Sequence, residues 1–237
     1  MSTYLLPNSH TLEKVIQESL ETTPQKGVLQ GTRRLTKGRS GKRIVFFPSI
    51  KNNALMPCES RLEADNCLDL EFDSSVVSYR TQPFTIDLGA NKSYTPDSIH
   101  ENKLGGIVVR EVKFSGALAN AELLDRLDKI RSILSKASIE FIVLTENNLQ
   151  LPPRINNYKF LYRCSHQKYD EMLIEYAIGI LDRLPSPCSL RELRHQCNKS
   201  NLPPLIADSL LFLGLASYDE NQVLTPDSLI WKAGRES

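Results

Sequence analysis

The chain has 237 residues, of which 41% are hydrophobic and 24% charged, and its formal net charge is +1. This length exceeds the commonest domain size, so we expect one large domain or two smaller ones, with ample material for a core. No apolar run approaches the roughly 18 residues of a membrane span, and about the first thirty residues lack a signal-peptide core. The sequence therefore predicts a cytoplasmic protein without a membrane partner. The five cysteines form no CxxC motif, which predicts reduced thiols that pack in the core.

The charge is unevenly distributed along the chain. Between Glu21 and Glu59 there is no acidic residue, whereas several basic residues, the last of them Lys51, alternate there with glycines. A flexible basic segment suits contact with DNA phosphates, although a solvated linker would have the same composition. The candidate DNA-binding residues are Arg33, Arg34, Lys37, Arg39, Lys42 and Arg43.

Apolar periodicity predicts a mixed sheet flanked by helices over the first part of the chain. Leu12, Val15, Ile16 and Leu20 fall on one face of a short helix that can dock on the main domain. The further elements expected, in chain order, are a strand over 44–50, a helix over 58–71 after Pro57, strands over 76–79, 84–88, 94–99 and 107–112, a helix capped near Asn120 and a strand over 139–144. This order predicts an α/β fold.

Three charged side chains are expected to converge at the end of one strand pair. Side chains alternate along a strand, so Glu111 and Lys113 point to the same face. If 94–99 is the neighbouring antiparallel strand and 102–106 the connecting turn, Asp97 faces the same place. The alternative without a catalytic role is a solvent-exposed strand edge with alternating charge.

This arrangement suits metal-assisted hydrolysis of a phosphodiester. Carboxylate oxygens bind hard divalent ions such as magnesium. The ion can polarise the phosphoryl group and supply hydroxide, while a lysine steadies the nucleophile or the developing negative charge. Glu63 is a further candidate ligand, because it shares a helix face with Cys67 and Leu70, and a half-buried carboxylate needs a partner. The alternative partner is an arginine, Arg61 or Arg80.

The combined motifs resemble the N-terminal domain of TnsA, the endonuclease subunit of heteromeric, Tn-seven-type transposases, over roughly residues 40 to 150. The segments that carry this resemblance are Ser60-Arg61-Leu62-Glu63, Leu70-Glu71-Phe72-Asp73, Val76-Val77, Tyr79, Gln82-Pro83-Phe84, Tyr94-Thr95-Pro96-Asp97 and Glu111-Val112-Lys113. The resemblance implies a restriction-endonuclease-like fold of the PD-(D/E)xK type over residues 1–165. It also implies Mg²⁺-dependent cleavage, with Mn²⁺ able to substitute, at the 5′ ends of a transposon during cut-and-paste transposition.

The resemblance also implies specific site residues and partners. The implied catalytic residues are Glu63, Asp97, Glu111 and Lys113, and the implied metal ligands are Glu63, Asp97, Glu111 and Val112. The implied partners are transposon-end DNA, the DDE-type transposase subunit TnsB and the AAA+ ATPase regulator TnsC. Two positions depart from the family pattern: Glu111 stands where some relatives have glutamine, and Ser98 stands where a large apolar residue is common. Neither departure removes a catalytic group.

Residues 166–237 are expected to form a separate winged-helix module. After a loop over 146–157 and a short run over 159–163, a helix is predicted over 169–184, with Met172, Leu173, Tyr176, Ile180 and Leu184 facing inward. Further helices are predicted from Ser189 and near Pro203. A hairpin is expected from 213–215, across 219–221, to 223–224.

The charges of this module argue against DNA docking through its third helix. From Pro203 to Leu213 that helix has Asp208 and no Lys or Arg, whereas the second helix has Arg191 and Arg194. Protein contact is therefore favoured, in line with the family, whose C-terminal region resembles a docking site for TnsC. The alternative is a small domain that only stabilises the nuclease.

Two classes of function remain open. The first is a nuclease subunit that cuts within a transposase assembly, which the four occupied catalytic positions favour. The second is a non-cutting DNA-binding or adaptor protein on a degenerate nuclease fold. A free-standing restriction-type nuclease is a further alternative, but the near-zero net charge predicts weak DNA affinity for the chain alone.

Overall fold

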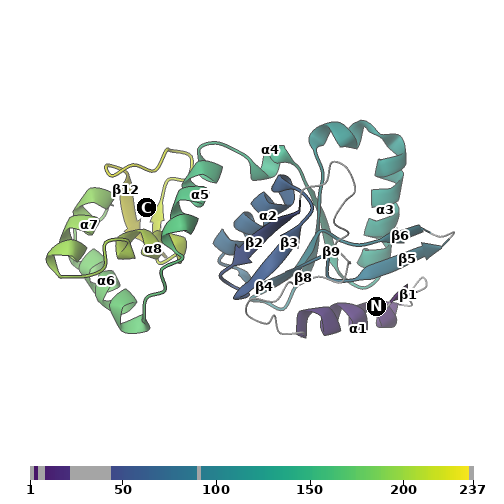
Figure 1. Ribbon diagram of the computed structural model, residues 1–237, viewed down its shortest axis with the longest axis horizontal. Coiled ribbons are helices and arrows are strands. Elements are labelled where there is room, and N and C mark those ends of the chain that lie inside the picture. The colour runs from purple at the N-terminus through teal and green to yellow at the C-terminus, as the bar shows by residue number, and fades with distance from the viewer. Residues whose placement is uncertain (1–2, 5–8, 22–43, 90–91, 235–237) are drawn as a thin grey trace. The chain divides into compact units, whose positions relative to one another are not determined.

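The computed structural model describes residues 3–4, 9–21, 44–89 and 92–234 (Figure 1). The chain divides into two compact units, residues 1–149 and 150–237. The division lies ahead of the expected boundary at residue 165, because helix α5 (Arg154–Cys164) packs on helix α8 (Ile206–Phe212) of the second unit. The predicted DNA-binding residues lie outside the described residues: Arg33, Arg34, Lys37, Arg39, Lys42 and Arg43.

A four-stranded mixed sheet organises the first unit, in the order β4-β7-β8-β9. The β4/β7 and β7/β8 pairs are antiparallel, whereas β8 and β9 are parallel and are connected through helix α3. Helices flank this sheet, which confirms the predicted mixed α/β class (Figure 1). The elements of the first unit are β1 (Thr3–Tyr4), α1 (Ser9–Glu21), β2 (Val45–Ser49), β3 (Ala54–Cys58), α2 (Arg61–Phe72), β4 (Val76–Thr81), β5 (Thr85–Gly89), β6 (Lys92–Tyr94), β7 (Ser98–Asn102), β8 (Ile107–Val112), the 3-10 helix η1 (Ser115–Ala119), α3 (Ala121–Ser135), β9 (Glu140–Leu144) and α4 (Glu146–Leu149).

Apolar side chains on both faces of the sheet hold these helices in place. On one face, Val109 and Phe141 join a core formed with α1 and α3. The four residues predicted to dock α1, Leu12, Val15, Ile16 and Leu20, are all buried in it. On the other face, Val112 packs with Leu62 of α2 and Leu149 of α4. Alternation along β8 thus sends successive residues to opposite cores.

The strand β3 is a difference from the sequence prediction. The sequence predicts a helix from Cys58, directly after Pro57, but both residues lie in β3, where Pro57 is opposite Phe46 of β2 in a two-stranded antiparallel pair. A proline is tolerated at such an edge because its missing N–H breaks no central ladder. Helix α2 instead begins after Ser60, whose side chain accepts a hydrogen bond from the Glu63 N–H.

Lys51 caps the other end of α2. Its ammonium donates to the carbonyl oxygens of Leu70, Asp73 and Val76 at 2.8, 2.5 and 3.0 Å. The carbonyls of Leu70 and Asp73 are among those that the end of a helix leaves without intrahelical partners, whereas Val76 is the first residue of β4. Although Lys51 belongs to the basic segment of the sequence, its ammonium is therefore engaged in stabilising the fold and is not available to contact phosphates.

The expected strand over 94–99 is divided into two. Tyr94 ends β6, which pairs with β5, while Ser98 opens β7, which pairs with β4 and β8. The intervening residues include Pro96, which has no N–H to offer a ladder. The predicted turn over 102–106 is confirmed, with the Asn102 side chain accepting from the N–H groups of Leu104 and Gly106.

Four helices and a three-stranded sheet form most of the described part of the second unit. The sheet has the order β10-β12-β11, and helix α8 contacts α5, α6 and α7. The elements are α5 (Arg154–Cys164), α6 (Glu171–Arg183), β10 (Cys188–Ser189), α7 (Leu190–Lys199), α8 (Ile206–Phe212), β11 (Ala216–Tyr218) and β12 (Leu229–Lys232).

Three predictions for this region are wrong. Residues 146–164 are largely helical, as α4 and α5, and not a loop followed by a short run. The hairpin partner of β11 is β12 and not 223–224, because the Leu224 N–H donates to the Asn157 side chain of α5. On α6, Met172 and Tyr176 are exposed, whereas Ala177, Ile180 and Leu181 are buried.

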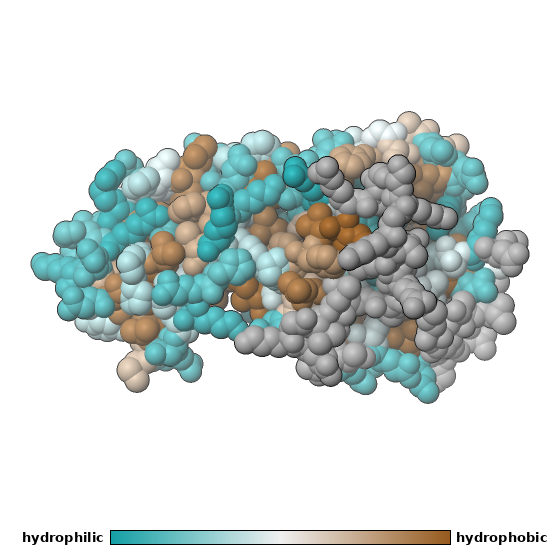
Figure 2. Space-filling model, in the orientation of Figure 1, coloured by the Kyte–Doolittle hydropathy of each residue, from teal (hydrophilic) through white to brown (hydrophobic). Residues whose placement is uncertain are grey.

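The described surface carries both polar and apolar side chains. Figure 2 shows hydrophilic residues over much of the viewed face of residues 150–234, with apolar residues between them. No helix within the described ranges combines the length and the apolar character needed to cross a membrane. All five cysteines are buried free thiols, as predicted.

Candidate active site

Asp97, Glu111 and Lys113 lie together at the end of β8, as the strand alternation predicts. The Lys113 Nζ contacts Glu111 Oε1, lies 3.5 Å from Asp97 Oδ2 and donates to the Val112 carbonyl oxygen at 3.0 Å. Asp97 immediately precedes β7, and its Oδ2 also accepts a hydrogen bond of 2.7 Å from the Val112 N–H. One ammonium is therefore surrounded by two carboxylates and a main-chain carbonyl.

Tyr94 orients one of these carboxylates. Its hydroxyl donates to Glu111 Oε2 at 2.8 Å, and its buried ring packs edge-on against Phe141 of β9. Both carboxylate oxygens of Glu111 are thus engaged, one by Tyr94 and one by Lys113. No local pattern predicts this contact of Tyr94, because it joins β6 to β8 and depends on how the strands pack.

Glu63 lines the same site but makes different contacts. One of its oxygens accepts from the Glu59 N–H at 2.7 Å and the other from the Ser60 hydroxyl at 2.9 Å. With the Ser60 cap this is a variant of the capping box at the start of α2, in which the glutamate accepts from the N–H of the residue before the N-cap. These contacts, and neither Arg61 nor Arg80, satisfy the carboxylate in the structure.

A chain of polar groups joins α2 to the strands of the site. The Asn66 amide donates to the fully buried Ser98 hydroxyl at 2.9 Å, and its oxygen accepts from Arg110 at 3.3 Å. Arg110 also pairs with Asp69 at 2.8 Å. Ser98 therefore has a specific hydrogen-bond partner on the helix that carries Glu63.

A cavity of about 630 Å³ opens beside these residues. One wall consists of the charged groups at the strand ends and the start of α2, including Glu63, Asp97, Glu111 and Lys113. Helix α3 also lines the cavity, with Arg126 and apolar side chains. The cavity thus combines acidic, basic and apolar surface, and all of its lining residues belong to the first unit.

The electrostatics of the site are dominated by burial of like charges. Burial, and then the neighbouring Glu111 carboxylate, raise the pKa of Asp97 to about 8, against the opposing effect of Lys113. Burial also raises the pKa of Glu63. The pKa of Lys113 is raised, because Asp97 and Glu111 outweigh the opposing effect of its burial. A cation added among these carboxylates would be favoured electrostatically.

The raised pKa of Asp97 predicts a pH-dependent difference in stability between the native chain and Asp97→Asn. The unfolded carboxyl ionises near pH 4 and the folded one near pH 8. Between these values the folded state holds the extra proton, so the free energy of unfolding of the native chain falls with rising pH. The asparagine does not titrate and can still accept from the Val112 N–H.

We therefore expect the stability of Asp97→Asn relative to the native chain to increase from about pH 4 to about pH 8, and then to level off. Urea denaturation in EDTA, followed by circular dichroism, measures it. Fluorescence of Trp231, the single tryptophan, reports the second unit and should show no such trend. A difference that is constant with pH would contradict the raised pKa.

The donor set suits a hard divalent cation only in part. Within the described part of the chain, no group of three or more His, Cys, Asp or Glu side chains is arranged to hold a metal ion. Asp97 and Glu111 come together, whereas Glu63 is held by its capping box. The oxygens of Asp97, Glu111 and Val112 nevertheless surround a single cation, the Lys113 ammonium. These are the oxygen donors that magnesium prefers, so the residues fit the ion once Lys113 gives way.

The site therefore offers two kinds of chemistry at the wall of one cavity. Its carboxylates can hold a cation or accept a proton, and its lysine can stabilise negative charge. Arg126 of α3, which the sequence analysis did not single out, also lines the cavity and adds an anion-binding group. Comparisons with models of known protein families and with curated proteins found no match for this chain.

Proposed function

We propose that this protein is the DNA endonuclease subunit of a heteromeric transposase, similar to TnsA, and that it cleaves the 5′ ends of a transposon by Mg²⁺-dependent hydrolysis. The observation that carries the proposal is the ring of Asp97, Glu111 and Val112 oxygens around the Lys113 ammonium. These are three of the four metal ligands and three of the four catalytic residues that the motif resemblance implies. Together with Glu63, which lines the same cavity, these residues come from three segments of the chain: α2, the residue before β7 and the end of β8.

Each residue has a distinct role in this proposal. Asp97 and Glu111 would hold the ion, with the Val112 carbonyl as a further ligand, and the bound ion would supply Lewis acidity and a water that ionises near neutral pH. Tyr94 keeps Glu111 in position through its hydrogen bond. Lys113 steadies the attacking hydroxide or the negative charge that develops on the phosphate. Glu63 adds negative charge that favours a cation, and it can reach a ligand position only by leaving its capping box.

The second unit supports a docking role more than a DNA-reading role. Its element order, with β10 between α6 and α7 and a hairpin after α8, is that expected of a winged helix. In such a module the third helix normally enters the major groove. Here every residue from Ile206 to Phe212 is buried, and α5 packs on the helix. Arg191 and Arg194 of α7 are paired with Asp227 and Asp208. We therefore propose that this unit contacts an ATPase partner of the TnsC kind.

The experiment that tests the proposal is nicking of a labelled transposon-end duplex by the full chain together with its DDE-type transposase. We expect nicks at the 5′ ends with Mg²⁺ or Mn²⁺ and none in excess EDTA. Ca²⁺ should bind but support little turnover, because its looser coordination positions the water poorly.

The same assay separates the alternatives. Cleavage that continues undiminished in EDTA would contradict the metal-dependent mechanism. Binding of the duplex without nicking in any metal would favour a non-cutting adaptor. Efficient cleavage by the chain without its transposase partner would favour a free-standing nuclease.

A further inference from the structure

Arg126 lines the cavity but has no role in the proposed cleavage chemistry. It belongs to α3 and lines the same cavity as the carboxylates. Its Nη2 donates to the Ser93 carbonyl oxygen at 3.0 Å, and it forms no ion pair with any carboxylate in the described ranges. Lys113, by contrast, is neutralised by Glu111 and Asp97. Arg126 therefore retains donors for an anion that enters the cavity.

A second groove, of about 460 Å³, shares Arg126 with the first cavity. Lys92 of β6 and Lys129 of α3 also line it, and neither lysine forms an ion pair with another described residue. Glu122 and Asp125 lie on the same groove, so its charged lining is three cations and two carboxylates. The cationic side chains thus extend from the cavity along the β6 side of α3.

We propose that Arg126 binds the phosphate that neighbours the scissile one on the DNA strand, and that the groove with Lys92 and Lys129 carries the same strand away from the site. This rests on the proposed nuclease function. A guanidinium matches two phosphate oxygens at once, which fixes the strand as well as attracting it. The two lysines would contact the backbone as point charges, and with Arg126 they outnumber the two carboxylates of the groove, Glu122 and Asp125.

A purely structural role does not account for this arginine. Arg126 is exposed, and its contact with a carbonyl oxygen leaves most of its donors facing the cavities. Arg131, on the same helix, shows the contrasting case. It pairs with Asp128, its guanidinium lies 5.7 Å from the centre of the Phe141 ring, and it lines neither cavity.

The test is the affinity of the full chain for a fluorescent transposon-end oligonucleotide, measured by anisotropy in Ca²⁺ at several salt concentrations. We expect Arg126→Ala to weaken binding about fivefold to tenfold at low salt and to reduce the slope of log K against log salt by about 1. Arg126→Lys should restore the slope but only part of the affinity, because a lysine cannot grip two oxygens. Arg131→Ala removes the same charge from the same helix and should change the affinity less than about twofold.

The outcomes distinguish this inference from the function on which it rests. Unchanged binding by Arg126→Ala, or an equal loss in Arg131→Ala, would overturn the assignment of Arg126 even if Asp97→Ala abolished nicking. Weakened binding by Arg126→Ala but not by Arg131→Ala would support the phosphate contact of Arg126, and normal nicking by Asp97→Ala would then overturn only its placement beside a scissile phosphate. Melting temperatures of the three variants should match that of the native chain, since all replace exposed side chains.

Discussion

Replacing Asp97 with alanine should lower 5′ nicking at the transposon ends by at least about a thousandfold. The change removes a proposed metal ligand, and the charge stabilisation that a catalytic ion supplies is worth several kcal/mol of the barrier, at about 1.4 kcal/mol for each tenfold in rate. The companion variant Asp97→Asn should lose as much activity while keeping an acceptor for the Val112 N–H. Asp128→Ala, which removes an exposed carboxylate from α3, should nick normally.

The products of transposition should change together with this loss. If the transposase partner cuts and joins the 3′ ends, each 5′ strand would stay attached to the donor in the Asp97→Ala strain. Replication through that branched product fuses donor and target, so co-integrates should replace simple insertions. Sequencing insertion products from Asp97→Ala, Glu63→Ala and Lys113→Ala strains measures this. Simple insertions in all three would show that the site does not cut, and loss of every product would indicate a role in assembly.

Replacing Arg194 with alanine should destabilise the second unit by about 3–5 kcal/mol, because it leaves a buried carboxylate without its cation. Asp208 of α8 is fully buried, and Arg194 of α7 engages both of its oxygens. Urea denaturation followed by Trp231 fluorescence reports this unit directly, and a fall in the midpoint with an unchanged slope would give the loss of stability.

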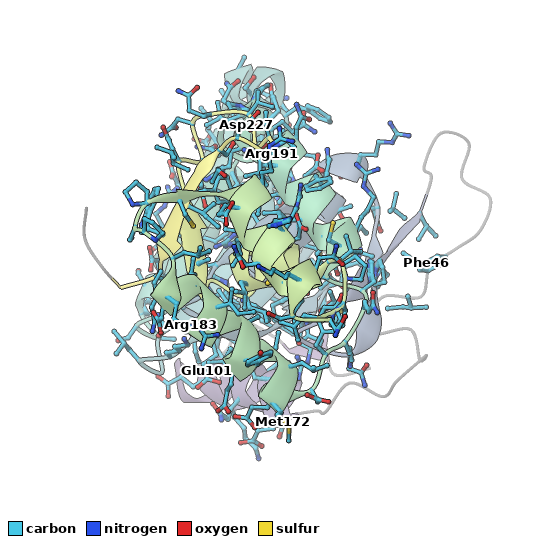
Figure 3. All side chains as sticks on the ribbon, turned by 90° about the vertical axis from the view of Figure 1, so that its left-hand side faces the viewer. Phe46, Glu101, Met172, Arg183, Arg191 and Asp227 are labelled. Carbon is cyan, nitrogen blue, oxygen red and sulfur yellow. The ribbon has the colours of Figure 1, made fainter. Side chains whose placement is uncertain are left out.

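The matched control lies one turn away on the same helix. Arg191 also engages both oxygens of an aspartate, Asp227, but the two side chains are 65% and 74% exposed. Figure 3 shows this pair side by side at the surface of the second unit. Solvent screens exposed pairs, so Arg191→Ala should cost less than about 1 kcal/mol. Equal losses in the two variants would show that burial of Asp208 does not govern the strength of the Arg194 pair.

Local patterns predicted much of the first unit because its elements are strongly periodic or clearly capped. The face of α1, the alternation of β8 and the Asn120 cap of α3 are each encoded within a few residues. The convergence of Asp97, Glu111 and Lys113 followed from the same alternation. The capping box of Glu63 could also have been found, since Ser60 three residues before a glutamate is its signature.

Contacts between distant segments explain what the sequence did not predict. Helix α5 has a weak apolar period of its own and is buried against α8, about fifty residues further along. Likewise, Asn157 fixes the loop that moves the second hairpin strand from 223–224 to β12. The contacts of Tyr94 and Arg126 at the site depend on how β6 and α3 meet β8. The spacing of residues along the chain does not encode such tertiary contacts.

The hydrogen bond between Ser98 and Asn66 has an evolutionary consequence. Both side chains are buried, so an apolar residue at position 98 would leave the Asn66 amide without this partner, at a cost of about 1–3 kcal/mol. Replacing both by apolar side chains of suitable size would avoid most of that cost, because the amide donor would be removed together with its acceptor, while Arg110 would keep its ion pair with Asp69. Positions 66 and 98 should therefore covary among homologues of this protein. Serine at position 98 should occur with a hydrogen-bonding residue at position 66, and an apolar residue at position 98 should occur with an apolar residue at position 66.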